Sequence, residues 1–125
     1  MNAETYGSKH VMEAEFLEEG ERLIARPQGR MEAADGDNFA SAVEERLQPK
    51  TKSVTIDLEQ LEFVNFGGIR AILRLARSLK DGQRNLDFVR GGEAVREALD
   101  QAGLDDFFPF TPPYTSNRGN QDETP

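Results

Sequence analysis

A short apolar segment passes directly into an amphipathic helical pattern near the middle of the chain, and this strand-to-helix turn constrains the fold most strongly. Residues 61–64 are predicted to form a strand, and residues 69–80 carry apolar side chains at the three- and four-residue spacing of a helix. The turn between them reads Asn65-Phe66-Gly67-Gly68. Asn65 is a residue type that caps helices, and two glycines let another molecule approach the backbone closely. We therefore expect this turn to be a recognition surface.

The turn lacks the side chains that carry out covalent chemistry. No Ser, Thr, Tyr, His or Cys occurs between Ile56 and Arg77, so nothing there can attack a substrate, shuttle a proton or accept a phosphoryl group. The chain has no cysteine, and its single histidine, His10, has no second His or Cys with which to bind a metal. Asp57, at the end of a predicted strand, is expected to bond a turn rather than to act in catalysis. We expect a protein that is not an enzyme and that binds neither a metal ion nor a cofactor.

The first half of the chain alternates between strand and helix patterns. Residues 11–17 and 22–25 are predicted to form a hairpin around the Glu19-Gly20 turn. The Pro-Gln-Gly segment at 27–29 is expected to end the second strand, and residues 30–32 to form a short edge strand. A helix is expected next, and its markers are a cap at Asp35 or Asp37, an apolar face of Phe39, Val43 and Leu47, and a stop at Pro49.

The second half continues the alternation. Residues 53–58 predict a central strand, and Asp81-Gly82 is expected to end the helix over residues 69–80. Residues 85–89 predict another strand, and a last helix is expected after Gly91-Gly92, with Val95, Leu99 and Ala102 facing inward. This order predicts an α/β fold: a mixed sheet of four to five strands with about four helices, mainly on one face.

Length and charge indicate how many domains the chain forms and which classes of partner it is expected to bind. A chain of 125 residues fits one domain, for which we expect a disordered N-terminus over residues 1–9, a folded domain over 10–110 and a disordered tail over 111–125. The net charge of −8 argues against general nucleic-acid binding, which needs Lys and Arg to neutralise phosphates. No apolar run approaches membrane-spanning length, and no signal peptide is recognisable, so we expect a cytoplasmic protein without membrane insertion.

Residues from about 11 to 110 resemble the STAS family, which is named for sulphate transporters and anti-sigma factor antagonists. The segments that carry the resemblance keep the order and spacing of the family, and they are residues 29–33, 54–58, 61–64, 68–73, 86–89 and 102–105. The resemblance implies a STAS-like (SpoIIAA-like) fold. Free-standing members typically carry Asp-Ser-Ser-Gly at the strand-to-helix turn. A partner kinase, itself an anti-sigma factor, phosphorylates the second Ser, and the added charge and bulk release the partner.

Aligned with that motif, Asn65 takes the Asp position, Phe66 the first Ser, Gly67 the phosphoacceptor and Gly68 the closing Gly. Gly67 has no hydroxyl, so the family position cannot be phosphorylated. The resemblance implies an anti-sigma factor antagonist-like protein-interaction module of a bacterial partner-switching pathway that lacks the phosphorylatable serine. Its partner would be a protein, of the anti-sigma factor or kinase-like type. Two alternatives stay open: a STAS subunit of a lipid-transporting ABC system, and a small-ligand-binding STAS domain.

The expected partner-binding surface combines this turn with one face of the following helix. Phe66 either packs inward or projects as an aromatic anchor. Arg70, Arg74 and Arg77 follow i, i+4, i+7 spacing and are expected to pair with acidic groups. Residues 70–84 contain five basic and one acidic residue, whereas residues 93–106 contain five acidic and one basic residue. A weak homodimer, through a sheet edge or through helices, is left open.

Overall fold

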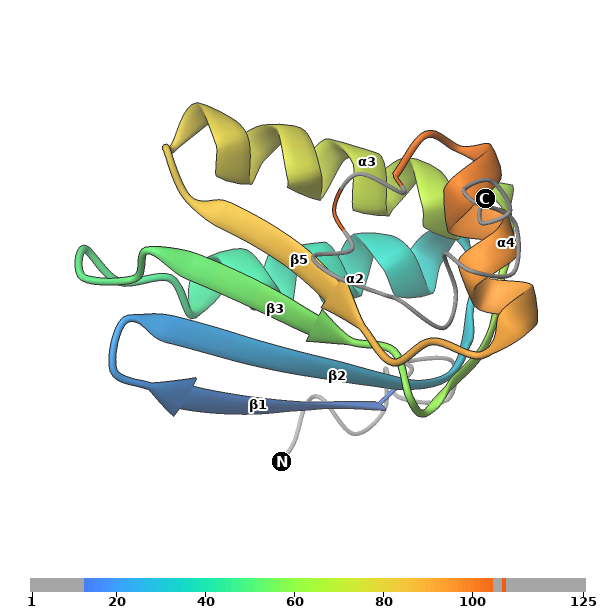
Figure 1. Cartoon of the computed structure of the whole chain (residues 1–125), viewed down its shortest axis with the longest axis horizontal. Coiled ribbons are helices and arrows are strands. Elements are labelled where there is room, and N and C mark those ends of the chain that lie inside the picture. The colour runs from blue at the N-terminus through green and yellow to red at the C-terminus, as the bar shows by residue number, and fades with distance from the viewer. Residues whose placement is uncertain (1–12, 105–106, 108–125) are drawn as a thin grey trace, which may run out of the picture.

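The structure is a computed structural model that describes residues 13–104 and residue 107 (Figure 1). The described part contains five strands and three helices, in agreement with the predicted α/β class. In chain order the elements are β1 (Glu13–Glu19), β2 (Arg22–Met31), α2 (Ala33–Glu45), β3 (Ser53–Asp57), β4 (Leu61–Val64), α3 (Phe66–Asp81), β5 (Asn85–Val89) and α4 (Glu93–Gln101). The predictions on His10, on the N-terminal segment 1–9 and on the tail 111–125 lie outside the described residues.

The sheet is mixed, with strand order β1-β2-β3-β5. β1 and β2 form the predicted antiparallel hairpin, and Gly20 adopts a φ of 60° in its tight turn, a conformation that glycine takes without strain. β3 runs parallel to β2 and β5 runs parallel to β3. β4 pairs with the far end of β2, where Arg30 lies opposite Phe63 and Met31 opposite Val64. The end of β2 is therefore the neighbour of the segment that leads into the turn.

The second strand is longer than its sequence predicts. Pro27 was expected to end it and residues 30–32 to form a separate edge strand, but β2 continues to Met31, whose side chain is fully buried. The physical reason is the place of Pro27 in the sheet. β2 pairs with β3 only as far as Ala25 and with β4 only from Gly29 onward, so Pro27 lies between the two pairings. A residue without an N–H therefore removes no bond of either parallel ladder.

Both early helices begin before the residues that the sequence indicated. α2 begins at Ala33 with Glu32 as its cap, and Asp35 lies in the first turn, where its Oδ2 accepts a hydrogen bond from the Glu32 N–H at 3.0 Å. Neither Asp35 nor Asp37 is the cap, although Asp35 completes a capping box. α3 begins at Phe66 rather than at residue 69, so both glycines of the turn are helical.

The core lies between one face of the sheet and the helices. α2 and α3 run alongside each other over that face, and α4 lies at the end of the sheet near the start of α3 (Figure 1). Alternate strand residues face the helices and are buried, among them Leu23, Ala25, Val54, Ile56 and Phe88. The opposite face of the sheet carries the side chains between them, such as Ile24 and Arg26. The helices therefore lie mainly on one face, as predicted.

Candidate functional site

The turn between β4 and α3 is held by hydrogen bonds to its own helix and to β2. Asn65 caps α3, and its Oδ1 accepts a hydrogen bond from the Gly68 N–H at 2.8 Å. The Asn65 N–H donates to the Met31 carbonyl oxygen at 3.1 Å. The predicted capping role of Asn65 is confirmed, and the bond to Met31 fixes the turn to the end of the neighbouring strand.

Phe66 projects from this turn into solvent. It is 88% exposed, whereas most apolar residues of α3 are buried. Of the two interpretations that the sequence allowed, the inward-packed one is wrong and the projecting one is correct. The first residue of α3 therefore exposes a large apolar side chain to water, which is typical of a residue that contacts another molecule.

The two glycines that follow pack closely against other elements of the fold, and Gly68 is buried whereas Gly67 is half-buried. A Cβ placed on Gly67 would lie 2.5 Å from the Cβ of Ala33, at the start of α2. A Cβ on Gly68 would lie 2.7 Å from the Met31 carbonyl oxygen. A third close approach involves Gly36 of α2. A Cβ placed on Gly36 would lie 3.0 Å from the Cα of Gly68. The glycines thus let α3 approach β2 and α2, which is a role within the fold that the sequence interpretation did not assign to them.

An apolar groove of ≈ 510 Å³ runs beside Phe66. One side is formed by the end of β4 and the start of α3, and the other side by the last turns of α4. Its lining is mostly apolar and comprises Phe63, Val64, Asn65, Phe66, Ile69, Ala98, Gln101 and Ala102. None of these side chains can act as a nucleophile or as a general base near neutral pH. The geometry therefore suits apolar contact rather than catalysis.

The three arginines of α3 are all exposed, but their surroundings differ. Arg74 forms an ion pair with Asp37 of α2, so its charge already has a partner in the molecule. Within the described part of the chain, Arg70 and Arg77 have no acidic partner. Arg70 lies one helical turn beyond Phe66 in α3, so both residues lie on the same side of the helix.

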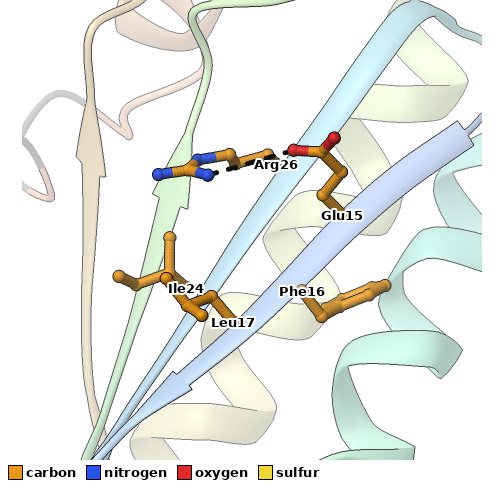
Figure 2. Close-up of a pocket in the computed structure, with 5 residues that line it drawn as sticks. All are labelled: Glu15, Phe16, Leu17, Ile24 and Arg26. Atoms are coloured by element: carbon orange, nitrogen blue, oxygen red, sulfur yellow. Dashed lines mark ion pairs between the residues drawn. The ribbon is translucent and has the colours of Figure 1, made fainter.

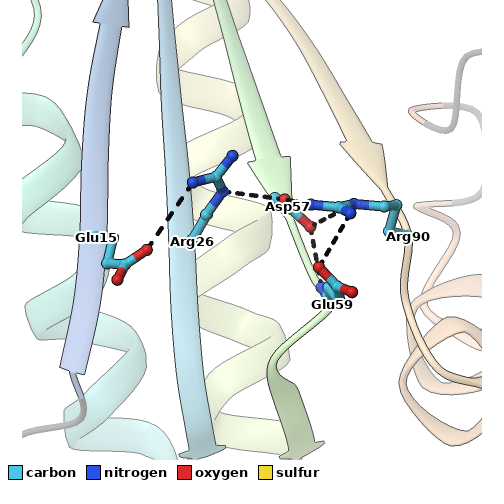
Figure 3. A network of polar contacts seen from close by, with 5 residues as sticks. All are labelled: Glu15, Arg26, Asp57, Glu59 and Arg90. Atoms are coloured by element: carbon cyan, nitrogen blue, oxygen red, sulfur yellow. Dashed lines mark hydrogen bonds and ion pairs between the residues drawn. The ribbon is translucent and has the colours of Figure 1, made fainter.

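A separate polar cluster lies at the carboxyl end of β3, around the carboxylate of Asp57 (Figure 3). The Asp57 side chain is only 4% exposed. It accepts hydrogen bonds from Arg26 Nε at 3.1 Å, from the Glu59 N–H at 3.1 Å and from Arg90, which reaches both carboxylate oxygens. Arg90 also pairs with Glu59 at 3.0 Å, and Arg26 lies 3.9 Å from Glu15. Asp57 therefore bonds the turn after its strand, as predicted, and joins β2 to the end of β5.

These contacts set the acidity of Asp57. Burial by itself would raise the pKa of the Asp57 carboxyl, because an ion loses hydration in the interior. The hydrogen bonds from Arg90, the Glu59 backbone and Arg26 act in the opposite direction, and the pKa of Asp57 is lowered overall. The carboxylate thus stays ionised and paired, which fits a structural role rather than that of a general acid.

The open face of the sheet has a shallow apolar patch on β1 and β2 (Figure 2). Leu17, which is 43% exposed, lies beside Ile24, and the Arg26–Glu15 pair borders them. Phe16 points the other way and stacks on Phe39 of α2 with ring centroids 6.3 Å apart. This patch is on the sheet face that the helices leave uncovered, away from the turn at Phe66.

Two features are absent from residues 13–104 and 107. No group of three or more His, Asp or Glu side chains there is arranged to hold a metal ion. None of the helices in that part combines the length and the hydrophobicity needed to cross a bilayer.

The family model for the STAS domain matches residues 13–116 of the chain. The chain belongs to the STAS domain family. A curated relative, the candidate anti-sigma factor antagonist BtrV of Bordetella bronchiseptica, is 26% identical over 87 residues, which are 70% of this STAS chain and 75% of BtrV.

Solved structures agree on the fold of this STAS domain. An anti-sigma factor antagonist from Mycobacterium paratuberculosis superposes with a TM-score of 0.67 at 19% identity, over 81% of this chain and 86% of that one. The unphosphorylated anti-sigma factor antagonist SpoIIAA has a TM-score of 0.66 at 16% identity, over 91% of this chain and all of that one. A structure of Mglu matches 63% of this chain at a TM-score of 0.58 and 18% identity, but only 20% of the Mglu chain is covered.

Sequence reasoning found the turn but missed the groove. The predicted residues 65–68 and Arg70 lie together at the start of α3, whereas Arg74 faces α2. Ala98, Gln101 and Ala102 complete the groove from α4, about thirty residues away in the sequence. The periodic pattern placed Ala102 on the inner side of its helix, but alanine and glutamine carry no signal that they border a site. Only the packing of α4 beside β4 shows that they do.

Proposed function

We propose that this STAS domain is an anti-sigma factor antagonist-like protein-interaction module that binds its partner through the Asn65–Gly68 turn and the start of α3. The observation that carries the proposal is the exposure of Phe66, whose side chain is 88% exposed. The turn around it contains no residue with a hydroxyl group. Aromatic side chains that become buried on binding are among the residues that contribute most of the binding energy at interfaces. Arg70 and Arg77 supply charges that would steer an acidic partner.

The module would work without enzymatic chemistry and without a covalent switch at this turn. Gly67 stands at the position that the family uses as phosphoacceptor, and it cannot carry a phosphoryl group. The surroundings also leave no room for a serine, because Ala33 occupies the space of a Cβ at position 67. Binding would then depend on the concentrations of the module and its partner. The similarity to BtrV supports a partner of the anti-sigma factor type.

Affinity capture with the full chain as bait tests this function. The proteins retained from the native cell extract are identified by mass spectrometry for wild type, Phe66→Asp and Leu17→Asp. Leu17→Asp is the matched control, because it places the same charge on an exposed apolar residue of the opposite sheet face. We expect wild type and Leu17→Asp to retain a histidine-kinase-like anti-sigma factor that Phe66→Asp loses. Recovery of an ABC-transporter ATPase instead would contradict the proposal and favour a transporter subunit.

A further inference from the structure

The groove beside Phe66 is bordered by two helices of opposite charge. On the α3 side, Arg70 follows Phe66 by one turn and is exposed. On the α4 side, Glu97 is exposed and lies one turn before the groove residue Gln101, to which it is hydrogen-bonded at 3.5 Å. The wider charge pattern is the same: the residues of α3 and its end are basic, and those of α4 and its end are acidic.

The surface formed by Phe66, the groove, Arg70 and Glu97 (the groove patch) contains both a projecting side chain and a hollow. Phe66 stands at one edge as the projecting side chain. The hollow next to it is lined by apolar side chains, including Phe63, Ile69 and Ala98, and its ≈ 510 Å³ fall within the size range of sites that enclose small molecules. An aromatic side chain is smaller than such ligands, so a ring from another chain can enter.

A twofold-symmetric contact places one surface patch against an identical copy, so that each residue i meets residue j and each j meets i. Such a patch has to supply both halves of every contact. This one supplies a ring and a hollow, and it supplies a cation and an anion at the border. We propose that a second copy of this chain occupies the groove, with Phe66 of each protomer in the hollow of its partner and Arg70 of each facing Glu97 of the other.

The strength expected of this contact follows from its parts. Burial of two Phe66 rings gives the main attraction, since each ring leaves water. The border charges are solvated, so they contribute mainly to orientation and to the exclusion of other arrangements. We therefore expect a reversible dimer whose population rises with protein concentration.

Self-association would also cover the turn that we propose as the partner-binding surface. The dimer would then compete with the partner, and the free turn would be regulated by concentration rather than by phosphorylation. This consequence rests on the proposed function, whereas the self-association rests only on the shape and charge of the patch.

Sedimentation velocity of the full chain over a concentration series, at a single moderate ionic strength, tests the proposal. Phe66→Asp, Arg70→Glu and Glu97→Arg are each expected to raise the dissociation constant at least about tenfold, and Leu17→Asp to leave it within about twofold. Circular dichroism and thermal melting confirm that each variant is folded. The decisive sample is an equimolar mixture of Arg70→Glu and Glu97→Arg. In a dimer of one copy of each, both border contacts again join opposite charges, so the mixture should regain the association that each variant loses alone.

Three results would overturn the inference. The first is a wild-type chain that stays monomeric at concentrations up to about 1 mM. The second is a dimer that survives Phe66→Asp but is lost with Leu17→Asp, which would place the contact on the open sheet face. The third is a mixture of the two charge variants that associates no better than either one. None of these results affects whether affinity capture recovers an anti-sigma factor, so a failure of the dimer and a failure of the proposed function are distinguishable.

Discussion

Gly67 occupies a position where the molecule has no room for a side chain. Its would-be Cβ lies 2.5 Å from the Ala33 Cβ and 2.9 Å from the Ala33 Cα, closer than real atoms approach. Because Ala33 is the first residue of α2, relief of this contact requires that two helices move apart. The absence of a phosphoacceptor is therefore built into the packing of α2 on α3, beyond the identity of a single residue.

Gly67→Ser is accordingly expected to lower the free energy of unfolding by about 1–3 kcal/mol, the usual cost of overpacking. The gain in helix propensity, less than about 1 kcal/mol, does not offset the clash. Urea unfolding measures the change. In a double-mutant cycle, Ala33→Gly should recover part of the loss, since it removes the atom that the new Cβ meets.

Gly92→Ser is the matched control, because no atom lies within 4 Å of a Cβ at that position and because serine, like glycine, is favoured at the N-cap of α4. It should change the free energy of unfolding by less than about 0.5 kcal/mol, the range of ordinary surface substitutions. Equal stability of Gly67→Ser and wild type would show that α2 gives way readily and that the turn could accept a serine.

The lowered pKa of Asp57 predicts that this residue makes the stability of the fold depend on pH. Folding lowers the pKa of its carboxyl, so the stabilisation is fully present above the ordinary value of about 4 and is lost as the pH falls through the lower value of the folded protein. Asp57→Asn removes the charge but nearly keeps the shape. We expect the variant to be less stable than wild type at pH 7, and the difference to shrink as the pH falls below about 4.

Thermal melting of both proteins from pH 7 to pH 3 measures this difference. Asp87→Asn serves as a comparison, since Asp87 accepts a hydrogen bond from Thr55 Oγ1 at 2.7 Å but forms no ion pair with an arginine in the described part of the chain. A constant gap between wild type and Asp57→Asn over the whole range would mean that the ion pairs with Arg26 and Arg90 do not stabilise the fold.

At the level of whole elements, α3 is the helix that presents the site, and its start depends on Asn65. The Asn65 side chain satisfies the Gly68 N–H, one of the donors that the first turn leaves without a helical partner. Asn65→Ala should cost about 1 kcal/mol, as other cap removals do, whereas Asn65→Asp keeps an acceptor and should cost much less. Chemical denaturation distinguishes the two. An alanine variant as stable as wild type would show that the bond from the Asn65 N–H to Met31 holds the turn by itself.

Elements with a strong local pattern could be predicted from the sequence, and elements shaped by neighbours could not. The strand Asn85–Val89 and the Asn65 cap matched their predictions because alternation and capping are local properties. The length of β2 could not be predicted, because Pro27 is tolerated only where β3 has ended and β4 has not begun. The start of α3 was placed too late because two glycines are poor helix formers, and close packing against α2 overrides that preference.

The candidate site shows the same division. The turn and its exposed arginines were predicted from residue types and spacing. The direction of the Phe66 ring, the pairing of Arg74 with Asp37 and the far side of the groove depend on where α2 and α4 lie. Contacts between elements distant in sequence leave no periodic signal in a single chain.

For the molecule as a whole, the arrangement separates two surfaces with different characters. The helical side presents Phe66, its groove and the cations of α3, whereas the open sheet face presents Leu17 and Ile24 beside the Asp57 network. Since the two surfaces lie on different faces, a substitution on one leaves the other unchanged and can serve as its control. The role of Phe66 can therefore be tested by comparing a substitution at Phe66 with the same substitution at Leu17.

The most direct test is the dissociation constant between this chain and the anti-sigma factor retained by affinity capture, measured by isothermal titration calorimetry for wild type, Phe66→Asp and Leu17→Asp. If Phe66 anchors the interface, Phe66→Asp should weaken binding at least about thirtyfold, the equivalent of a hot-spot loss of about 2 kcal/mol. Leu17→Asp should stay within about twofold of wild type. Equal affinities for Phe66→Asp and wild type would contradict the claim that this turn is the recognition surface.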